Sequence, residues 1–378
     1  MSTSSPPRLG SVTNRAIAHA RLRNSRLVGP KLEAPEDVVA WLGAVQAQDL
    51  PGALWGMSQR LAPDGTGTTL ETLGAALDAG RFIRTHGPRP TWHFLTPNDL
   101  RWILGLVGPR VQAQSATMLR REGIDPDERE RAIEILRSSL RGHVALTRVE
   151  LGAALSAGGI ERVEGLRLGL LGMNAELEGV ICNGPRRGRQ ATYVLVDEFV
   201  PRGPDFTPGE ALRELTVRYF RSHGPALAHD MGWWSGLTVG SVREGIALAG
   251  ASLERRGIDG REYWAAAGGF EPGPIPERHV ALLPNYDEYV GSYTDYTPIF
   301  DESLPRARTT ADVLGTHLVV RDGLVVGGWR RALGSKAVIV TATLLMDLDA
   351  TELDALHAAA AEFGRFVGLP VDLRLARG

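Results

Sequence analysis

The feature that most constrains the fold is a pattern of short helices, a turn and a two-stranded hairpin, which recurs in three regions of the chain. Thr-x-x-Glu capping boxes begin at Thr147 and Thr207, and each predicts the first turn of a helix. Turn-forming residues near Gly87 and over residues 183–189 predict hairpins between short strands. We therefore expect an α+β chain that contains tandem helix-turn-helix units.

The pattern changes near residue 275 to short strands, which predicts a C-terminal β-rich domain. These strands are expected at residues 279–283, 313–320, 324–329 and 337–343, followed by a helix over 351–367 and a strand over 371–375. The proline-rich residues 270–276 are the expected linker. The expected organisation is a disordered tail (1–12), three helix-turn-helix units (13–107, 108–204 and 205–274) and the β-rich domain (275–378).

Three predicted helices are relevant to the candidate site. In the first unit, a helix is predicted over residues 35–48. Thr96 followed by Pro97 predicts the start of another helix, which is expected to end near Val107. In the second unit, the amphipathic residues 163–180 occupy the position of a DNA-recognition helix.

The composition is that of an ordinary globular protein. The 378 residues are 43% hydrophobic and 23% charged, which is enough to bury a large core. No apolar run is long enough to span a membrane, and the polar N-terminus lacks the apolar core of a signal peptide, so we expect a cytoplasmic protein. The single cysteine, Cys182, excludes an internal disulfide, and no residues show metal-ligand spacing, so we expect no metal.

The charge balance argues against an indiscriminate basic nucleic-acid binder. The formal net charge is −2, so a role on DNA would need arginines gathered on one surface. Lys31 and Lys336 are the only lysines, and all other basic side chains apart from the histidines are arginines, which suit forked contacts to phosphate. Genomic base composition is the alternative explanation for this preference.

Two glutamines, Gln46 and Gln48, are the strongest candidates for chemistry. Pro35 begins the predicted helix over residues 35–48 and Pro51 limits its continuation, so the glutamines lie where that helix ends. Amides both donate and accept hydrogen bonds, so the pair could hold a water molecule beside a developing positive charge. Asp49 would point about 100° away on a helix and is expected to be a cap rather than a base. A merely polar helix end is the alternative.

Several segments, in this order, resemble one known family. They are Leu42-Gly43-Ala44-Val45-Gln46-Ala47-Gln48-Asp49, Ala53-Leu54-Trp55, Gln59-Arg60-Leu61, Arg84-Thr85, residues 91–102, His223-Gly224-Pro225, residues 233–237, residues 282–287 and residues 322–330. Together they resemble the winged-helix DNA glycosylases of the AlkZ type, from about residue 8 to the C-terminus. The resemblance implies three winged-helix units and a C-terminal β-rich domain that form a C-shaped cleft.

The resemblance also implies an activity. In the related family a Gln-x-Gln motif carries catalysis, and the match places it on Gln46 and Gln48, with no acid at the second position. The implied protein is a monofunctional DNA glycosylase without cofactor, a monomer that acts on double-stranded DNA with bulky or crosslinked alkylpurines of the N7-alkylguanine type. The implied setting is DNA repair or self-resistance to a genotoxic natural product, in a bacterial cytoplasm and associated with the nucleoid.

The expected reaction does not require the protein to activate the leaving group strongly. An alkylated purine is already a cationic leaving group, so the enzyme has to stabilise an oxocarbenium-like sugar and orient a water. Which glutamine faces the sugar and which holds the water stays open. A glycosylase that also cuts the strand normally forms a Schiff base through an amine. With only Lys31 and Lys336, neither in the candidate site, a water-based mechanism is favoured.

The expected DNA contacts lie on two hairpins. The first carries Arg84, His86, Arg89, Trp92 and His93, where arginine could meet phosphate or a minor groove. The alternative for this hairpin is that the tryptophan is a core residue and the histidines are structural.

The second hairpin carries Arg186, Arg187 and Arg189 on its predicted turn, and a solvated loop is the alternative there. Two other groups are expected to be structural rather than functional. These groups are the acidic residues around Asp287 and the adjacent Trp233 and Trp234, for which core packing is expected.

Two non-catalytic functions remain as alternatives. The first is a winged-helix DNA-binding protein such as a transcription regulator, which would usually dimerise on symmetric half-sites. The sequence contains no coiled-coil heptads that would support such a dimer. The second is an interaction scaffold that has kept the fold and lost DNA binding.

Overall fold

The computed structural model describes residues 9–63, 68–271, 278–300 and 317–377. The first part of the chain contains α1 (Leu9–Asn24), α2 (Pro35–Leu42), β1 (Val45–Gln46), α3 (Leu50–Ser58), α4 (Leu70–Asp78), β2 (Ile83–His86), β3 (Trp92–Leu95) and α5 (Pro97–Arg121). The second contains α6 (Pro126–Ser139), β4 (Leu146–Thr147), α7 (Arg148–Ala157), α8 (Gly165–Leu177), β5 (Ile181–Arg187), β6 (Gln190–Leu195) and α9 (Val196–Phe199).

The remaining elements follow in two groups. The first comprises α10 (Pro208–Ser222), α11 (Ala228–Ser235), α12 (Val239–Ala249), η1 (Gly250–Ser252), β7 (Leu253–Ile258) and β8 (Arg261–Ala266). The second comprises β9 (Val280–Leu283), α13 (Glu288–Gly291), η2 (Thr297–Ile299), β10 (His317–Arg321), β11 (Leu324–Leu333), β12 (Val338–Leu344), α15 (Ala350–Val367) and β13 (Val371–Arg377).

One order of elements recurs three times: a helix, a short strand, two helices and a hairpin. In the first two occurrences the short strand pairs with the second strand of the hairpin, giving the sheet orders β1-β3-β2 and β4-β6-β5. In the third occurrence a single bridge, Ala226 to Trp264, takes the place of the short strand beside β8. The capping boxes expected at Thr147 and Thr207 are present at α7 and α10.

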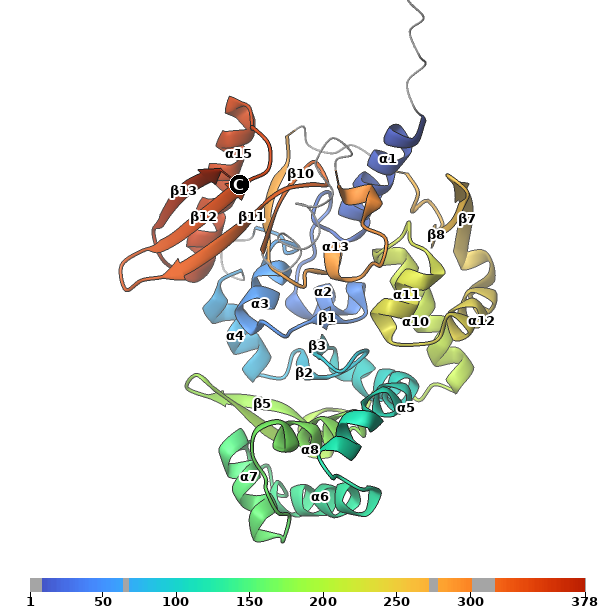
Figure 1. The fold of residues 1–378 in the computed structure, drawn as a ribbon, viewed down its shortest axis with the longest axis vertical. Helices are drawn as coiled ribbons and strands as arrows, with labels where there is room; N and C mark the ends of the chain where they lie inside the picture. The colour runs from blue at the N-terminus through green and yellow to red at the C-terminus, as the bar shows by residue number, and fades with distance from the viewer. Residues whose placement is uncertain (1–8, 64–67, 272–277, 301–316, 378) are drawn as a thin grey trace, which may run out of the picture.

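The C-terminal strands form a five-stranded sheet in the order β13-β12-β11-β10-β9. Every neighbouring pair is antiparallel except β12 and β13, which are joined in parallel through α15. The predicted strands and helix of this region are confirmed, apart from residues 313–316, which lie outside the described residues. Figure 1 shows β1 and the β2–β3 hairpin at the centre, between this sheet, α10–α12 and α6–α8.

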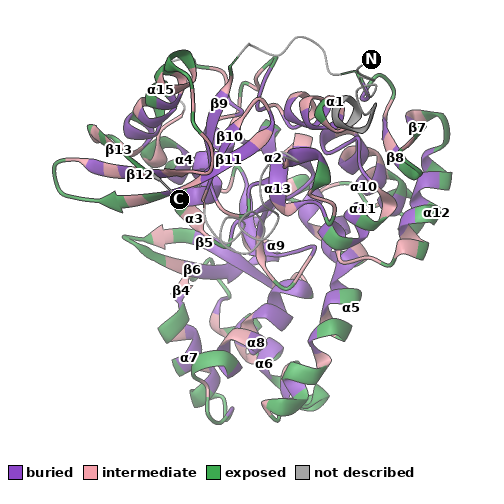
Figure 2. Ribbon diagram, turned by 45° about the horizontal axis from the view of Figure 1, so that its top comes forward, coloured by how far each residue is buried: buried purple, intermediate pink, exposed green. Residues whose placement is uncertain are grey.

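The first unit and the C-terminal sheet share one hydrophobic core. The ring of Trp55, on α3, lies 5.2 Å from that of Phe363, on α15. The indole of Trp55 also donates a hydrogen bond to the carbonyl of Leu282, on β9, at 2.6 Å. Figure 2 shows that α13 and β9 are largely buried. The β-rich region is therefore packed onto the first unit.

Helix α5 continues beyond its expected end at Val107 to Arg121. Its buried face includes Val107, which belongs to a core that draws residues from all three units, and Val111, which belongs to a core of the second unit. At Gly108, a Cβ would lie 2.8 Å from the carbonyl oxygen of Leu177, so this glycine lets α5 and α8 approach closely. The expected boundary between residues 107 and 108 falls inside this helix.

The helix predicted over residues 35–48 ends at Leu42 instead. Gly43 follows with a φ of +83°, a left-handed conformation that glycine adopts without strain and that stops the helix. The chain then forms the two-residue strand β1, so Gln46 lies on a strand rather than at a helix end.

Other local predictions also need correction. Residues 9–12, expected to be disordered, belong to α1, and most of the expected linker lies outside the described residues. Helix α8 is buried on most of its surface, so it does not present the open face that a major-groove recognition helix needs. Strand β5 extends through Arg187, which shortens the predicted turn. No helix within the described residues is long and apolar enough to cross a membrane.

Candidate active site

The site is built around β1, which lies at the edge of a small sheet beside β3. Gln46 pairs with His93 across the two strands, and the backbone N–H of Ala47 donates to the carbonyl of Trp92 at 2.7 Å. Residues two apart on an extended chain face the same side, whereas on a helix they would lie about 200° apart. The extended conformation therefore favours a shared face for Gln46 and Gln48.

Gln46 is buried and held by two contacts. Its backbone N–H donates to Oε1 of Glu288 at 2.7 Å, and its side-chain Oε1 accepts a hydrogen bond from the guanidinium of Arg89 at 2.5 Å. Arg89 stands at the tip of the β2–β3 hairpin, with its guanidinium 5.2 Å from the ring centre of Trp233. The hairpin therefore places a cation directly on the amide of the motif.

Gln48 is exposed, and its Oε1 accepts a hydrogen bond from the backbone N–H of Trp92 at 3.3 Å. Asp49 occupies the N-cap position of α3, but its side chain makes no capping hydrogen bond. Its carboxylate instead accepts a hydrogen bond from Arg331, on β11, at 2.7 Å. Asp49 was expected to cap a helix, but its side chain instead forms an ion pair that joins the motif to the C-terminal sheet.

Glu288 is a buried carboxylate with a full set of donors. Its Oε2 accepts hydrogen bonds from the indole of Trp234 at 2.9 Å, from the hydroxyl of Ser292 at 2.5 Å and from His223 at 3.3 Å. Burial alone would raise the pKa of Glu288, but the bonds from His223, Ser292 and the Gln46 backbone lower it to about 2. A fixed negative charge therefore lies directly behind Gln46.

Of the acidic residues around Asp287 that were expected to be structural, Glu288 instead contacts Gln46, whereas Asp287 and Asp295 make contacts of a structural kind. Asp287 forms a buried, two-pronged ion pair with Arg60 at 2.8 and 2.9 Å and also caps the backbone N–H of Tyr289. Asp295, further along, pairs with Arg261. Within the described ranges no group of three or more His, Cys, Asp or Glu side chains is arranged to hold a metal ion.

The hairpin residues expected at DNA mostly face the interior. Arg84 is buried, and its guanidinium donates to the carbonyl of Ala47 at 3.0 Å and to Oδ1 of Asn183 at 2.8 Å. Burial lowers the pKa of the Arg84 guanidinium. This arginine therefore fixes the backbone of the motif, and in this conformation it is not available to phosphate.

The two histidines of the hairpin are also internal. His93 is fully buried, and burial, followed by the nearby Arg89, lowers its pKa to about 3, so the imidazole is neutral at pH 7. His86 is buried against Glu176, with 2.5 Å between its Nδ1 and Oε2 of the glutamate. Both side chains are buried, so neither is exposed to a DNA backbone in this conformation. This burial favours the structural alternative for both histidines.

Trp92 is half-buried between two residues of its own hairpin. Its ring centre lies 4.3 Å from the guanidinium carbon of Arg84 and 4.6 Å from the ring centre of His86. The two tryptophans of α11 differ in burial, although core packing was expected for both. Trp234 is completely buried, whereas Trp233 is 48% exposed and lies beside Arg89.

The arginines of the β5–β6 hairpin differ in their partners. Arg186 binds Asp78 through its backbone N–H and its guanidinium, at 2.8 to 2.9 Å. Arg187 pairs with Glu150 at 2.7 Å. Arg189 is exposed, and no acidic side chain of the described residues pairs with it. Among the described residues no hydrogen bond or ion pair joins these three side chains to the glutamines, although the two hairpins touch where Arg84 donates to Asn183.

The first lysine is engaged away from the motif. The ammonium group of Lys31 donates to three backbone carbonyls, of Arg26, Leu27 and Gln59, at 3.1, 2.6 and 2.7 Å. Burial, followed by the charge of Arg60, lowers its pKa to about 8. Because all three N–H donors are used, the amine is not presented as a nucleophile. Lys336 lies on the exposed turn between β11 and β12.

Comparison with known proteins places this geometry in a family. The family model for "DNA glycosylase AlkZ-like" matches residues 39–366, a stretch that contains both glutamines and Glu288. The chain belongs to the AlkZ-like DNA glycosylase family. It is 27% identical over 349 residues to the "Interstrand DNA cross-link repair glycosylase" of Streptomyces sahachiroi, covering 86% of this chain and 90% of that protein.

A solved structure supports the fold of this AlkZ-like chain. The structure is the DNA glycosylase AlkZ of Streptomyces sahachiroi, which matches with a TM-score of 0.79 at 24% sequence identity. The match covers 96% of this chain and 99% of the other. At this identity the likeness is evidence for the mixed α/β fold.

Sequence reasoning missed several residues that surround the glutamines. Glu288, His223 and Trp234 meet behind Gln46, although they come from three separate segments of the chain. Two of these segments, with His223 and with Trp234, had been noted in the resemblance; Trp234 was expected to pack in the core, and His223 had no assigned role. Their signal was only their presence among the matching segments, because nothing local in the sequence shows that they converge on one carboxylate.

Proposed function

We propose that this AlkZ-like protein is a monofunctional DNA glycosylase that hydrolyses the N-glycosidic bond of bulky or crosslinked alkylpurines of the N7-alkylguanine type. The observation that carries the proposal is the setting of Gln46, held by Glu288 behind it and Arg89 beside it, next to the exposed Gln48. The name of the 27% identical relative, an interstrand cross-link repair glycosylase, supports crosslinked substrates.

In the proposed mechanism the amide of Gln46 faces the sugar and the amide of Gln48 holds the water. Gln46 is immobilised, and each amide oxygen has two lone pairs, so its Oε1 keeps acceptor capacity after binding Arg89. The negative charge of Glu288 lies behind it and favours positive charge in front, where the sugar would develop oxocarbenium character. Gln48 is exposed and is the better placed of the two to hold the attacking water.

The proposed scaffold is a set of three winged-helix units and a β-rich region, arranged as a C-shaped cleft around double-stranded DNA. The repeated order of helix, short strand, two helices and hairpin supports the three units, with α5 shared between the first two. We further propose a cytoplasmic, nucleoid-associated monomer that serves DNA repair or self-resistance to an alkylating natural product.

The function is tested with a DNA duplex that contains a single N7-alkylguanine. After incubation with the protein, hot alkali should convert each excised site to a strand break, and there should be no break before alkali. Borohydride should trap no covalent DNA adduct, because Lys31 is engaged with carbonyls and no Schiff base forms. A trapped species, or no alkali-sensitive site at all, would contradict the monofunctional glycosylase.

The glutamines are tested by Gln46→Ala and Gln48→Ala. Each substitution should slow single-turnover excision at least about tenfold, a loss of about 1.4 kcal/mol of transition-state stabilisation, with little change in DNA affinity. Gln114→Ala is the matched control, since Gln114 is an exposed amide on α5 outside the site. Full activity in the double variant would remove both glutamines from the mechanism.

A further inference from the structure

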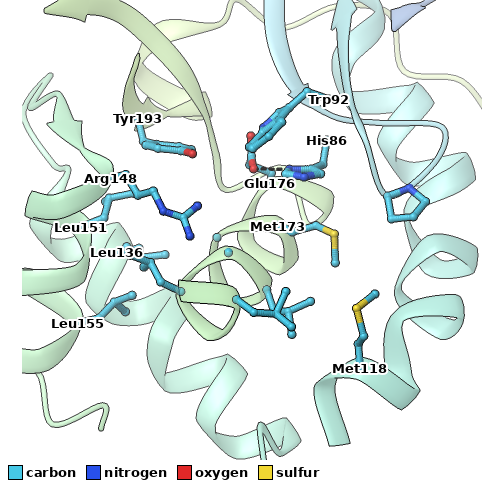
Figure 3. Close-up of a pocket in the computed structure, with 16 residues that line it drawn as sticks. His86, Trp92, Met118, Leu136, Arg148, Leu151, Leu155, Met173, Glu176 and Tyr193 are labelled. Carbon is cyan, nitrogen blue, oxygen red and sulfur yellow. Dashed lines mark hydrogen bonds and ion pairs between the residues drawn. The ribbon is translucent and has the colours of Figure 1, made fainter. Parts of the chain in front are cut away.

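A cavity of about 240 Å³ lies between the β2–β3 hairpin and helices α5 to α8. Its wall includes His86 and Trp92 from the hairpin, Leu136 from α6, Leu155 from α7, and Gly172 and Glu176 from α8. Figure 3 shows the hairpin residues His86 and Trp92 on one side and Leu136, Leu151 and Leu155 on the other. No step of the proposed reaction uses this cavity.

The cavity has an apolar inner end and an open mouth. Leu136 and Leu155 are fully buried within it, whereas Met118 and Leu166 are 41% and 55% exposed. Exposed side chains of this size in one place are unusual on a folded surface and are typical of a ligand site. An engineered cavity of about 150 Å³ already holds benzene, so this one has room for one or two rings.

Two polar groups in the wall lack hydrogen-bond partners among the residues that the structure describes. Oε2 of Glu176 is bound to His86, but Oε1 of the same carboxylate is buried and accepts no hydrogen bond. The indole N–H of Trp92 is likewise buried and donates to nothing. A buried polar atom without a partner is costly and calls for an explanation, and a ligand that donates to Glu176 would supply one.

We propose that this cavity binds a flat apolar group of one or two rings that carries an N–H or O–H donor for Glu176. The ring fills the space between the leucines and Trp92, and the donor satisfies Oε1 of Glu176. The apolar ring is required by one wall of the cavity and the hydrogen-bond donor by another. A ring without a donor therefore meets only the first requirement.

The cavity is joined to the candidate site by one residue. Trp92 lines the cavity with its ring, and its backbone N–H donates to Gln48. A ring group of this chemistry could be a free small molecule or the appendage of an alkylated base. The second source rests on the proposed function, because it requires an adduct to be bound at Gln46 and Gln48.

Binding is tested by calorimetry with indole, which has two rings and one N–H donor, against 1-methylindole, which has no donor. The wild-type protein should bind indole about tenfold more tightly, because a hydrogen bond to a charged acceptor is the difference between the two probes. Glu176→Gln removes that charge and should reduce the preference. Equal affinities for the two probes, or no binding of indole, would overturn the proposal.

The location is tested by filling the cavity. Gly172 lies on α8 in the cavity wall, and a Cβ there meets nothing within 4 Å, so Gly172→Leu places a side chain in the ring space without a backbone clash. Gly105→Leu is the matched control, because Gly105 is an exposed helical glycine on α5 with equally open space. Indole binding should be lost in the first variant only. Retained binding in Gly172→Leu would place the site elsewhere.

Excision assays distinguish the two sources. If the ring belongs to the adduct, Gly172→Leu should slow excision of a ring-bearing N7-alkylguanine and leave N7-methylguanine unaffected. If the ligand is a free molecule, both excision rates should stay unchanged while indole binding is lost. Failure of the wild type to excise either base would contradict the proposed function and would leave the calorimetric test of the cavity standing.

Discussion

At the scale of single residues, Gln46 is fixed by two contacts that restrict different parts of it. Glu288 binds the backbone N–H and fixes the position of β1, whereas Arg89 binds the amide and fixes its rotamer. A group that stabilises a transition state is most effective when it is already immobile before the substrate arrives. Gln48 has a single longer contact, to Trp92, and keeps more freedom to bind water.

Replacing Arg89 should separate positioning from DNA binding. Arg89→Ala frees the Gln46 amide, so the single-turnover excision rate at saturating protein should fall about tenfold. Arg89→Lys should recover part of that rate, because a lysine can donate one hydrogen bond to Oε1. Rapid-quench kinetics give the rate, and a binding titration gives the affinity. A loss of affinity at an unchanged saturated rate would make Arg89 a phosphate contact only.

His93 should make stability depend on pH. Burial lowers its pKa from 6.5 to about 3, so the unfolded chain binds a proton that the folded one excludes. The contribution of His93 to the free energy of unfolding is complete above pH 6.5 and is lost as the pH falls toward 3. Over that range the free energy of unfolding changes by about 1.4 kcal/mol per pH unit.

The measurement is urea unfolding of wild type and His93→Asn between pH 7 and pH 5, above the range where carboxylates titrate. Asparagine can keep the hydrogen bond to the carbonyl of Thr91 but has no proton to take up. The variant should therefore show the shallower dependence of unfolding free energy on pH. Parallel curves for the two proteins would mean that His93 is not shielded from water.

At the scale of elements, the sequence predicted those whose signals are local. The capping boxes at Thr147 and Thr207, and the turn at Gly323 between β10 and β11, depend on neighbouring residues and were placed correctly. Strand β1 was missed, because Val45 and Gln46 continue the apolar spacing of α2 and only the left-handed Gly43 interrupts it.

The site was predictable only in part, for the same reason. The glutamines were identified through their motif, whereas Glu288 became part of the site through contacts over long sequence distances. The internal positions of Arg84 and His93 also depend on what covers the hairpin. No local pattern distinguishes a hairpin arginine that faces solvent from one that binds a carbonyl such as that of Ala47.

Gly43 should be sensitive to any side chain. At a φ of +83°, an alanine is strained by about 1 kcal/mol, and its Cβ would lie 3.5 Å from the ring of Trp234. Gly43→Ala should lower the unfolding free energy by about 1 kcal/mol or more. Gly105→Ala, in a helical and open position, should be neutral or stabilising. Equal stability changes in chemical denaturation would contradict the role assigned to Gly43.

At the scale of the whole molecule, several arginines that could bind DNA are already paired with carboxylates of the protein. Arg186 and Arg187 are paired with Asp78 and Glu150, and Arg331 is paired with Asp49. Such pairs are already neutralised before DNA arrives, so the surface available to phosphate is smaller than the arginine content suggests. Among the expected contacts on the β5–β6 hairpin, this singles out Arg189.

The salt dependence of DNA binding should reflect this difference. Each phosphate that a cation neutralises contributes about −0.9 to the slope of log affinity against log salt. Arg189→Ala should make the slope shallower by about that amount, whereas Arg186→Ala should change it less, because Asp78 already binds that guanidinium. Fluorescence anisotropy over a series of salt concentrations gives both slopes. A larger effect at Arg186 would reverse the assignment.

The core shared by the first unit and the last helix has a consequence for biosynthesis. Trp55 packs against Phe363 and Phe366, and Gln46 is anchored by Glu288, so residues made early depend on residues made late. Until α15 has been made, the ring of Trp55 on α3 lacks these two aromatic partners and is exposed to aggregation. Gln46 acquires its anchor only after residue 288 has been made, and Asp49 acquires its ion-pair partner only after residue 331, so the site is assembled late relative to the motif itself.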